Sequence, residues 1–288
     1  MDRGHKMRCF FTSDLHYGVN AKGDRSVEAL ALHACTTGKK DDVLLIGGDI
    51  ATDDAHIRSC LALFAGFPGK RAAIAGNHDV WMEDERDSLQ RYMGLPALFR
   101  EGGFHPLEEE PFIAGGIGFA GAMGWYDLTF RDEEINVPLS AYRTKAYPGP
   151  DPELWGDAIC ARWEGDDSDV TAWQLSRLER QLKLLAGTSE TVVLLHHVPT
   201  KRLLTRPRFL VPKKWRFMNA FLGSERLAET VRQLAPNSLV VNGHIHMSGS
   251  VRVGDTDFLS IGGDYQSKQL VIKEGPTTRR MSFLSRDA

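Results

Sequence analysis

Short apolar runs alternate with amphipathic segments over the first quarter of the chain, and each run ends in polar residues. The runs at residues 10–12, 43–46 and 70–75 have the length of buried strands. Between them, residues 25–37 and 55–64 place apolar side chains at helical spacing. This β-α-β-α-β order predicts parallel strands joined by right-handed crossovers.

The alternation weakens in the middle of the chain. Residues 112–120 predict a strand pair or a bent, glycine-rich strand. Residues 148–169 are rich in proline, glycine and acidic residues, with Trp155 and Trp163 as apolar anchors. We favour a solvated loop pinned by these aromatic side chains, and the alternative is a lid or a substrate wall.

Regular elements resume near residue 169. Asp169 is placed to cap a long amphipathic helix that ends before Gly187. Residues 192–195 and 239–241 have the apolar pattern of buried strands, and between them a short helix follows Ser224 as its cap. The last predicted elements are antiparallel strands with a turn at Gly254-Asp255, at residues 251–253, 258–260 and 270–272.

The composition is that of an ordinary globular protein, with 42% hydrophobic and 25% charged residues. We expect one domain over residues 1–288, with an irregular insertion or cap at about 124–168. The net charge of −3 gives no global attraction to nucleic acid or to an anionic membrane. The four cysteines lack paired spacing, and no apolar run has the length of a signal peptide or a membrane span. We therefore expect a cytoplasmic protein without membrane contact.

Side chains that bind metal ions follow five of the predicted strands. Because ligands bind outside the carboxyl ends of parallel strands, these side chains are expected to converge. Imidazole together with carboxylate suits manganese, iron, zinc, cobalt or nickel. Seven ligands are too many for one tetrahedral ion and suit two ions that share a bridging carboxylate. The predicted ligands are Asp14, His16, Asp49, Asn77, His196, His244 and His246.

His78 differs from these ligands because it directly follows Asn77, so on a turn it would point along the rim of the site. Asp79 would hold its ring in orientation, as a carboxylate does in other acid–base pairs. Each motif alone also fits an ordinary polar turn. The purely structural interpretation is disfavoured because these strand ends together carry six of the ten histidines.

The ordered motifs resemble those of the calcineurin-like metallophosphoesterase superfamily. They are Asp14-x-His16, Gly48-Asp49, Gly76-Asn77-His78-Asp79, His196-His197-x-Pro199 and Gly243-His244-x-His246. The resemblance spans positions 14 to 246 and implies a four-layer α/β sandwich, in which helices flank two mixed β-sheets. It also implies a metal-dependent phosphoester hydrolase that uses two ions and a bridging hydroxide.

The resemblance further implies a role for each residue. Asp14, His16 and His246 would bind one ion, whereas Asn77, His196 and His244 would bind the other and Asp49 would bridge them. His78, paired to Asp79, would stabilise or protonate the leaving group. Val198 departs from the family pattern, since many relatives have proline there, and His197 remains a fallback ligand.

The walls of the site, rather than its metals, decide which phosphoester is cleaved. One candidate wall is residues 124–127, a Gly-Trp-Tyr-Asp stretch, together with the acidic segment behind it. The other is the basic segment 201–216, where substrate phosphate would meet Arg206, Arg208, Lys213 and Lys214. The alternative is a solvated loop whose charges balance the acidic segment.

We expect a small phosphodiester or phosphomonoester as substrate, with nucleotides among the candidates. A nuclease acting on DNA or RNA is the alternative enzyme, and the absence of an extended basic face disfavours it. The alternative of another class is a non-catalytic scaffold with the same fold. The complete set of predicted ligands disfavours that interpretation.

Overall fold

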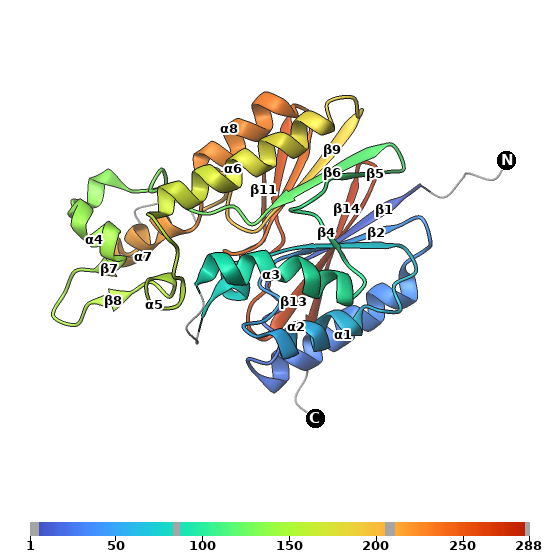
Figure 1. Ribbon diagram of the computed structural model, residues 1–288, viewed down its shortest axis with the longest axis horizontal. Coiled ribbons are helices and arrows are strands. Elements are labelled where there is room, and N and C mark those ends of the chain that lie inside the picture. Colours follow the sequence, from blue (N-terminus) through green and yellow to red (C-terminus); the bar gives the residue numbers. More distant parts are fainter. Residues whose placement is uncertain (1–5, 83–86, 205–210, 286–288) are drawn as a thin grey trace.

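Two six-stranded mixed sheets pack face to face in this computed structural model, which describes residues 6–82, 87–204 and 211–285 (Figure 1). The first sheet has the order β14-β13-β1-β2-β3-β4. Its strands are β1 (Arg8–Thr12), β2 (Val43–Gly47), β3 (Lys70–Ile74), β4 (His105–Pro106), β13 (Ser267–Glu274) and β14 (Thr277–Leu284). The second has the order β11-β12-β10-β9-β6-β5. Its strands are β5 (Phe112–Ala114), β6 (Ile117–Ala122), β9 (Glu190–Leu195), β10 (Leu239–Asn242), β11 (Gly249–Val253) and β12 (Thr256–Ser260).

Helices cover the outer face of each sheet (Figure 1). On the first sheet they are α1 (Ala21–Thr37), α2 (Asp54–Leu63) and α3 (Ser88–Glu101), and on the second α6 (Asp167–Leu184) and α8 (Glu225–Leu234). Phe10 packs toward the helices while Phe11 packs between the sheets, because successive strand side chains point to opposite faces. A strand buried on both faces is therefore a continuous apolar run. The predicted four-layer α/β sandwich is confirmed.

A group of short elements lies at one end of the sandwich, beside the carboxyl ends of the strands (Figure 1). Most come from the predicted insertion, and α7 comes from the basic segment. They are η2 (Glu133–Ile135), α4 (Leu139–Thr144), β7 (Ala146–Tyr147), β8 (Glu153–Leu154), α5 (Asp157–Cys160) and α7 (Lys213–Met218). The remaining short helices are η1 (His78–Val80), η3 (Lys201–Leu203) and η5 (Asn219–Phe221). Among the described residues, no helix is both long and apolar enough to cross a membrane.

Several elements differ from the sequence predictions, among them α6, α3 and β13. Helix α6 is capped by Asp166, and Asp169 instead completes the capping box by accepting from the backbone N–H of Asp166 at 3.2 Å. Helix α3 was not predicted because its apolar face is weak and Pro96 lies inside it. Strand β13 pairs with β1 and β14 rather than with the strands at 249–260, so the C-terminus completes the first sheet.

Candidate metal centre

The parallel strands end at one edge of the two sheets, and the predicted ligands lie in the loops that follow them. Among the residues that the structure describes, three groups of side chains have ligand atoms within 4.8 Å of one another. They are Asp14 with His16 and His246, His16 with Asp49 and His78, and Asp49 with His196 and His244. Asn77 joins the last group, since its Oδ1 lies 3.0 Å from Nε2 of His196. All seven predicted ligands are therefore brought together, with His78 beside them.

Backbone strain is concentrated at these residues. Of nine described non-glycine residues with positive φ, five belong to the predicted ligand set. They are Asp14 (56°), His16 (45°), Asp49 (52°), His244 (71°) and His246 (53°). A left-handed backbone is unfavourable for such residues and typically persists where the surrounding structure fixes a functional geometry.

Glycines allow the ligand loops to approach one another closely. A Cβ at Gly76 would lie 2.2 Å from Oδ1 of Asp49, and one at Gly243 would lie 2.5 Å from Oδ2 of Asp14. Real Cβ atoms essentially never come this close to other atoms. These positions therefore require glycine. This explains why the motifs Gly-Asn-His-Asp and Gly-His-x-His both begin with glycine.

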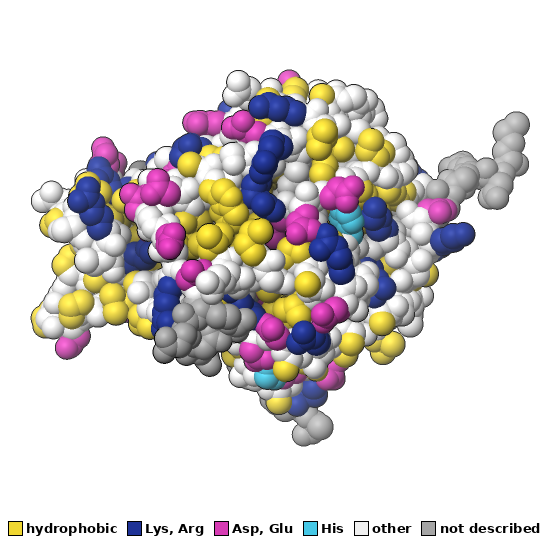
Figure 2. All heavy atoms as spheres, viewed as in Figure 1, with side chains coloured by type: hydrophobic (Ala, Val, Ile, Leu, Met, Phe, Trp, Pro, Cys, Tyr) yellow, Lys and Arg dark blue, Asp and Glu magenta, His cyan; other side chains and the backbone are white. Residues whose placement is uncertain are grey.

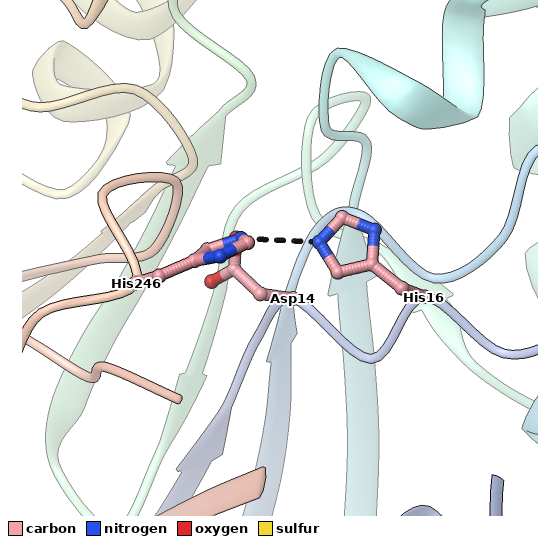
Figure 3. A group of neighbouring side chains, drawn as sticks. All are labelled: Asp14, His16 and His246. Atoms are coloured by element: carbon pink, nitrogen blue, oxygen red, sulfur yellow. Dashed lines mark hydrogen bonds and ion pairs between the residues drawn. The ribbon is translucent and has the colours of Figure 1, made fainter. Parts of the chain in front are cut away.

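The first group joins the loop after β1 to the loop after β10 (Figure 3). Nε2 of His16 faces Nε2 of His246 at 3.1 Å, and the latter lies 3.4 Å from Oδ1 of Asp14. Burial lowers the pKa of His16 to about 3, even though Asp49 and Asp14 lie nearby. The ring is therefore neutral at physiological pH, which is the form that binds metal ions.

The last group contains a buried nitrogen atom, Nε2 of His244, that has no hydrogen-bond partner among the described residues. In the same group, Nδ1 of His196 lies 2.8 Å from the carbonyl oxygen of Gly47, so its Nε2 points at the carboxylate and amide. Burial alone would lower the pKa of His196, but the charges of Asp49 and Asp14 raise it to about 9. A cation would supply the positive charge that these buried carboxylates attract, and would give His244 its missing partner.

Asp49 lies between the first group and the last group. Its Oδ2 is 3.7 Å from Nε2 of His16 and its Oδ1 is 3.3 Å from Nε2 of His196. One carboxylate thus presents an oxygen to each group, which is the arrangement that a bridging ligand needs.

His78 lies on the rim, with Nε2 3.9 Å from Oδ2 of Asp49. Its ring packs on Trp81, with 3.6 Å between ring centres and planes inclined by 30°. Asp79 does not hold this ring. Its Oδ1 accepts from the backbone N–H groups of Ile50 and Ala51, and its Oδ2 accepts from that of Gly76. The predicted pairing is wrong because the carboxylate turns inward and ties together the loops after β2 and β3.

His197 does not belong to any of the three groups. Its Nδ1 lies 3.2 Å from the carbonyl oxygen of Met123, and its ring centre is 4.5 Å from that of His244. His197 therefore packs against the ring of His244 and is not placed to replace His196 as a ligand.

A cavity of about 700 Å³ opens over the ligands. Asp49, Asn77, His78, His244 and His246 form its floor, and the walls above are mainly apolar. Among the described lining residues there is no lysine or arginine. The principal wall residues are Trp81, Trp155, Val211, Trp215, Met218 and Leu222.

The predicted walls are only partly correct. Trp125 and Tyr126 are fully buried in the core and do not line the cavity, whereas Trp155 of the acidic segment does. Lys213 and Lys214 lie on α7 but do not line it either, and Lys214 forms an ion pair with Glu153. Arg206 and Arg208 lie outside the described residues.

Solved structures with this architecture are found by comparison of the fold. The phosphopantetheinyl hydrolase of Mycobacterium tuberculosis is 19% identical, with a TM-score of 0.65 and 91% of each chain covered. A putative 5′-nucleotidase from Staphylococcus aureus is 10% identical, with a TM-score of 0.53, and the match covers 98% of this chain and 55% of that one. GAP50, the anchor in the inner membrane complex of Plasmodium, is 8% identical, with a TM-score of 0.51 and coverage of 96% and 84%. Comparison with curated proteins gives no significant match.

The sandwich and its clustered imidazoles, carboxylates and amide define a metal-dependent phosphoesterase. A sequence model described as calcineurin-like phosphoesterase matches residues 7–248. The chain belongs to that family, and the protein is a hydrolase of phosphoric esters.

Proposed function

We propose that the protein hydrolyses a small phosphodiester at a two-metal site and that the apolar cavity holds one of the two ester arms. The observation that carries this proposal is the cavity wall, in which the described residues offer indole, aliphatic and thioether groups but no cationic side chain. A phosphomonoester is mostly dianionic at neutral pH, because its second pKa is about 6. A phosphodiester carries only one negative charge. Its second ester arm would be stabilised by burial against the apolar walls, by about 25 cal/mol per Å² of apolar surface.

The residues of the floor fit two ions. Asp14, His16 and His246 would hold one, Asn77, His196 and His244 the other, and Asp49 both. Manganese, iron, zinc, nickel and cobalt all suit this donor set. When bound, such ions supply Lewis acidity, which activates water as the nucleophile and neutralises the phosphate.

His78 is the proposed proton donor to the leaving group. It lines the cavity on the rim of the ligand groups, and its side chain remains 14% exposed. Its ring packs on Trp81, and its Nε2 lies 3.9 Å from Oδ2 of Asp49, so that this edge of the ring faces the predicted ligands. A positioned acid of this kind typically contributes about 10²- to 10⁴-fold in rate.

A phosphopantetheinyl ester is one diester that should be tested. A structure of similar fold is described as a phosphopantetheinyl hydrolase, and the two chains cover each other over 91% of their lengths. An extended arm on the phosphate would suit a cavity of about 700 Å³ with largely apolar walls.

Nucleic acid is disfavoured as the substrate. Acidic and basic side chains are interspersed over the face shown in Figure 2, and the net charge is −3. Binding to a polyanion depends on clustered cations that release its counterions. The interspersed charges instead favour a small substrate that enters the cavity.

The test compares bis-p-nitrophenyl phosphate with p-nitrophenyl phosphate after metal stripping and addition of Mn²⁺. We expect kcat/KM for the diester to exceed that for the monoester by at least about tenfold, a difference of ~1.4 kcal/mol. Asp49→Ala should abolish both activities. A preference for the monoester would overturn the diesterase proposal, and the phosphopantetheinyl ester would then be replaced by nucleoside monophosphates in the next assay.

A further inference from the structure

The insertion contributes one completely buried carboxylate to the surroundings of the metal centre. Asp157, on α5, accepts hydrogen bonds from three side chains. Two of them flank η1, and the third lies two residues before Asp157. Its Oδ1 accepts from Nδ2 of Asn77 at 2.9 Å and from Nε1 of Trp81 at 2.6 Å. Its Oδ2 accepts from Nε1 of Trp155 at 2.8 Å.

We propose that Asp157 is a positioning residue with two roles. It turns the amide oxygen of Asn77 toward the metal position that Asn77 would share with His196 and His244, called the second metal position below. It also ties the cavity wall to that position. This inference rests on the proposed two-metal site and names a residue that the ligand motifs do not include.

The chemistry of the amide decides which of its atoms can bind a cation. Asn77 has one acceptor oxygen and an NH₂ group that only donates, so only the oxygen binds a cation. A reversed amide would place that oxygen against the carboxylate of Asp157, which is itself an acceptor. The reversed orientation is therefore unfavourable, and Oδ1 is directed at Nε2 of His196, 3.0 Å away.

The same carboxylate fastens both tryptophans at the cavity floor. Trp81 packs on His78, and the ring centre of Trp155 lies 6.2 Å from that of His244. One acidic side chain thus fixes a ligand, the wall beside the proposed proton donor and the wall beside the second ion. Because three N–H groups of other side chains donate to this carboxylate, an apolar residue at position 157 would leave all three donors without this acceptor.

Binding of Mn²⁺ to the metal-free protein, measured by isothermal titration calorimetry, tests this inference without an activity assay. Wild-type protein is expected to bind two ions. Asp157→Leu, which removes the acceptor but keeps a side chain of similar size, should weaken the second ion by about 10- to 100-fold, the usual effect of losing a partner that orients a ligand, and leave the first unchanged. Asp167→Leu is the matched control, since Asp167 also accepts from an indole, that of Trp125 at 2.9 Å, but pairs with Lys145 rather than with a predicted ligand.

Exchanging the residue types at positions 77 and 157 provides a second test, which does not depend on whether the single Asp157 variant folds. Asn77→Asp alone sets two carboxylates against each other, whereas adding Asp157→Asn restores a donor opposite an acceptor. We expect the double variant to bind the second ion at least about tenfold more tightly than Asn77→Asp.

The two proposals fail in different ways. Two ions bound with wild-type affinity in Asp157→Leu, or no recovery in the double variant, would overturn the role of Asp157 while leaving the two-metal site intact. A single ion bound to the wild-type protein would overturn the two-metal site itself.

Discussion

The Nε2 atoms of His16 and His246 face each other at 3.1 Å, although 230 positions separate the two residues in the sequence. Both rings lie beside Asp14, and both residues have a left-handed backbone. Two ring nitrogens beside a carboxylate are a donor set that suits a transition-metal cation, and we propose that they share one. The stability of the protein should therefore depend on that cation.

Metal removal is the first prediction. Stripping with a chelator should abolish hydrolysis and lower the melting temperature by several degrees, because an ion that binds only the folded state stabilises it. The gain is ~2.7 kcal/mol per site when free Mn²⁺ is about 100-fold above Kd. Thermal unfolding with and without Mn²⁺ measures it. Asp49→Asn should show a much smaller response to Mn²⁺, and an equal response in both proteins would contradict the assigned bridging role.

Replacement of His78 should reveal its role through the leaving group. His78→Asn should lower kcat by about 10²- to 10⁴-fold for a diester with an alkyl leaving group, because that alkoxide needs a proton. The loss should be much smaller for p-nitrophenolate, which departs readily as an anion. His56→Asn is the control, since His56 is half-exposed and does not line the cavity. Equal losses for both leaving groups would assign His78 to binding or to metal support instead.

Trp215 should determine how tightly the ester arm binds. Its side chain lines the cavity and is 53% exposed, so Trp215→Ala should remove a contact without unfolding the protein. We expect KM for bis-p-nitrophenyl phosphate to rise by about tenfold with kcat little changed, equivalent to ~1.4 kcal/mol of uniform binding. Lys213→Ala, two positions away and outside the cavity lining, should leave KM unchanged. If only the lysine variant raised KM, contact between the basic segment and substrate phosphate would regain support.

The ligand residues were predictable from sequence because each lies in a short motif at the end of a buried strand. An apolar run followed by a polar residue fixes both the strand and the position of its carboxyl end, and parallel pairing then brings the ends together. Asp157 had no such signal. It is 80 positions from Asn77, in an irregular insertion, and only the folded chain places its carboxylate under that amide.

The cavity wall was misjudged for a related reason. The basic segment suggested phosphate contact, but α7 is a helix, and side chains on different faces of a helix have different surroundings. Trp215 and Met218 line the cavity, while Arg216 pairs with Asp132 and Glu134. Residue types were visible in the sequence, but the face that each residue occupies depended on how α7 packs against the insertion.

An ion pair far from the metal centre ties the start of β1 to the loop before β2. Asp42 accepts from the backbone N–H of Arg8 at 2.9 Å, from its Nη2 at 2.6 Å and from the backbone N–H of Lys39 at 2.8 Å. Nη2 of Arg8 also donates to the carbonyl oxygen of Thr37. Burial alone would raise the pKa of Asp42, but the hydrogen bonds from Arg8 and Lys39 lower it below its usual value.

This depressed pKa predicts how stability responds to acid. A carboxylate that loses protons more readily when folded contributes stability above its unfolded pKa of about 3.9, and that contribution disappears as the pH falls through the lower folded value. Asp42→Asn should therefore cost ~2 kcal/mol of unfolding free energy at pH 7, as expected for hydrogen bonds to a charged group. The difference between the two proteins should shrink below about pH 4. Urea unfolding in the presence of a chelator measures this without a contribution from metal release. A difference that stays constant down to about pH 3 would show that Asp42 acts through shape rather than charge.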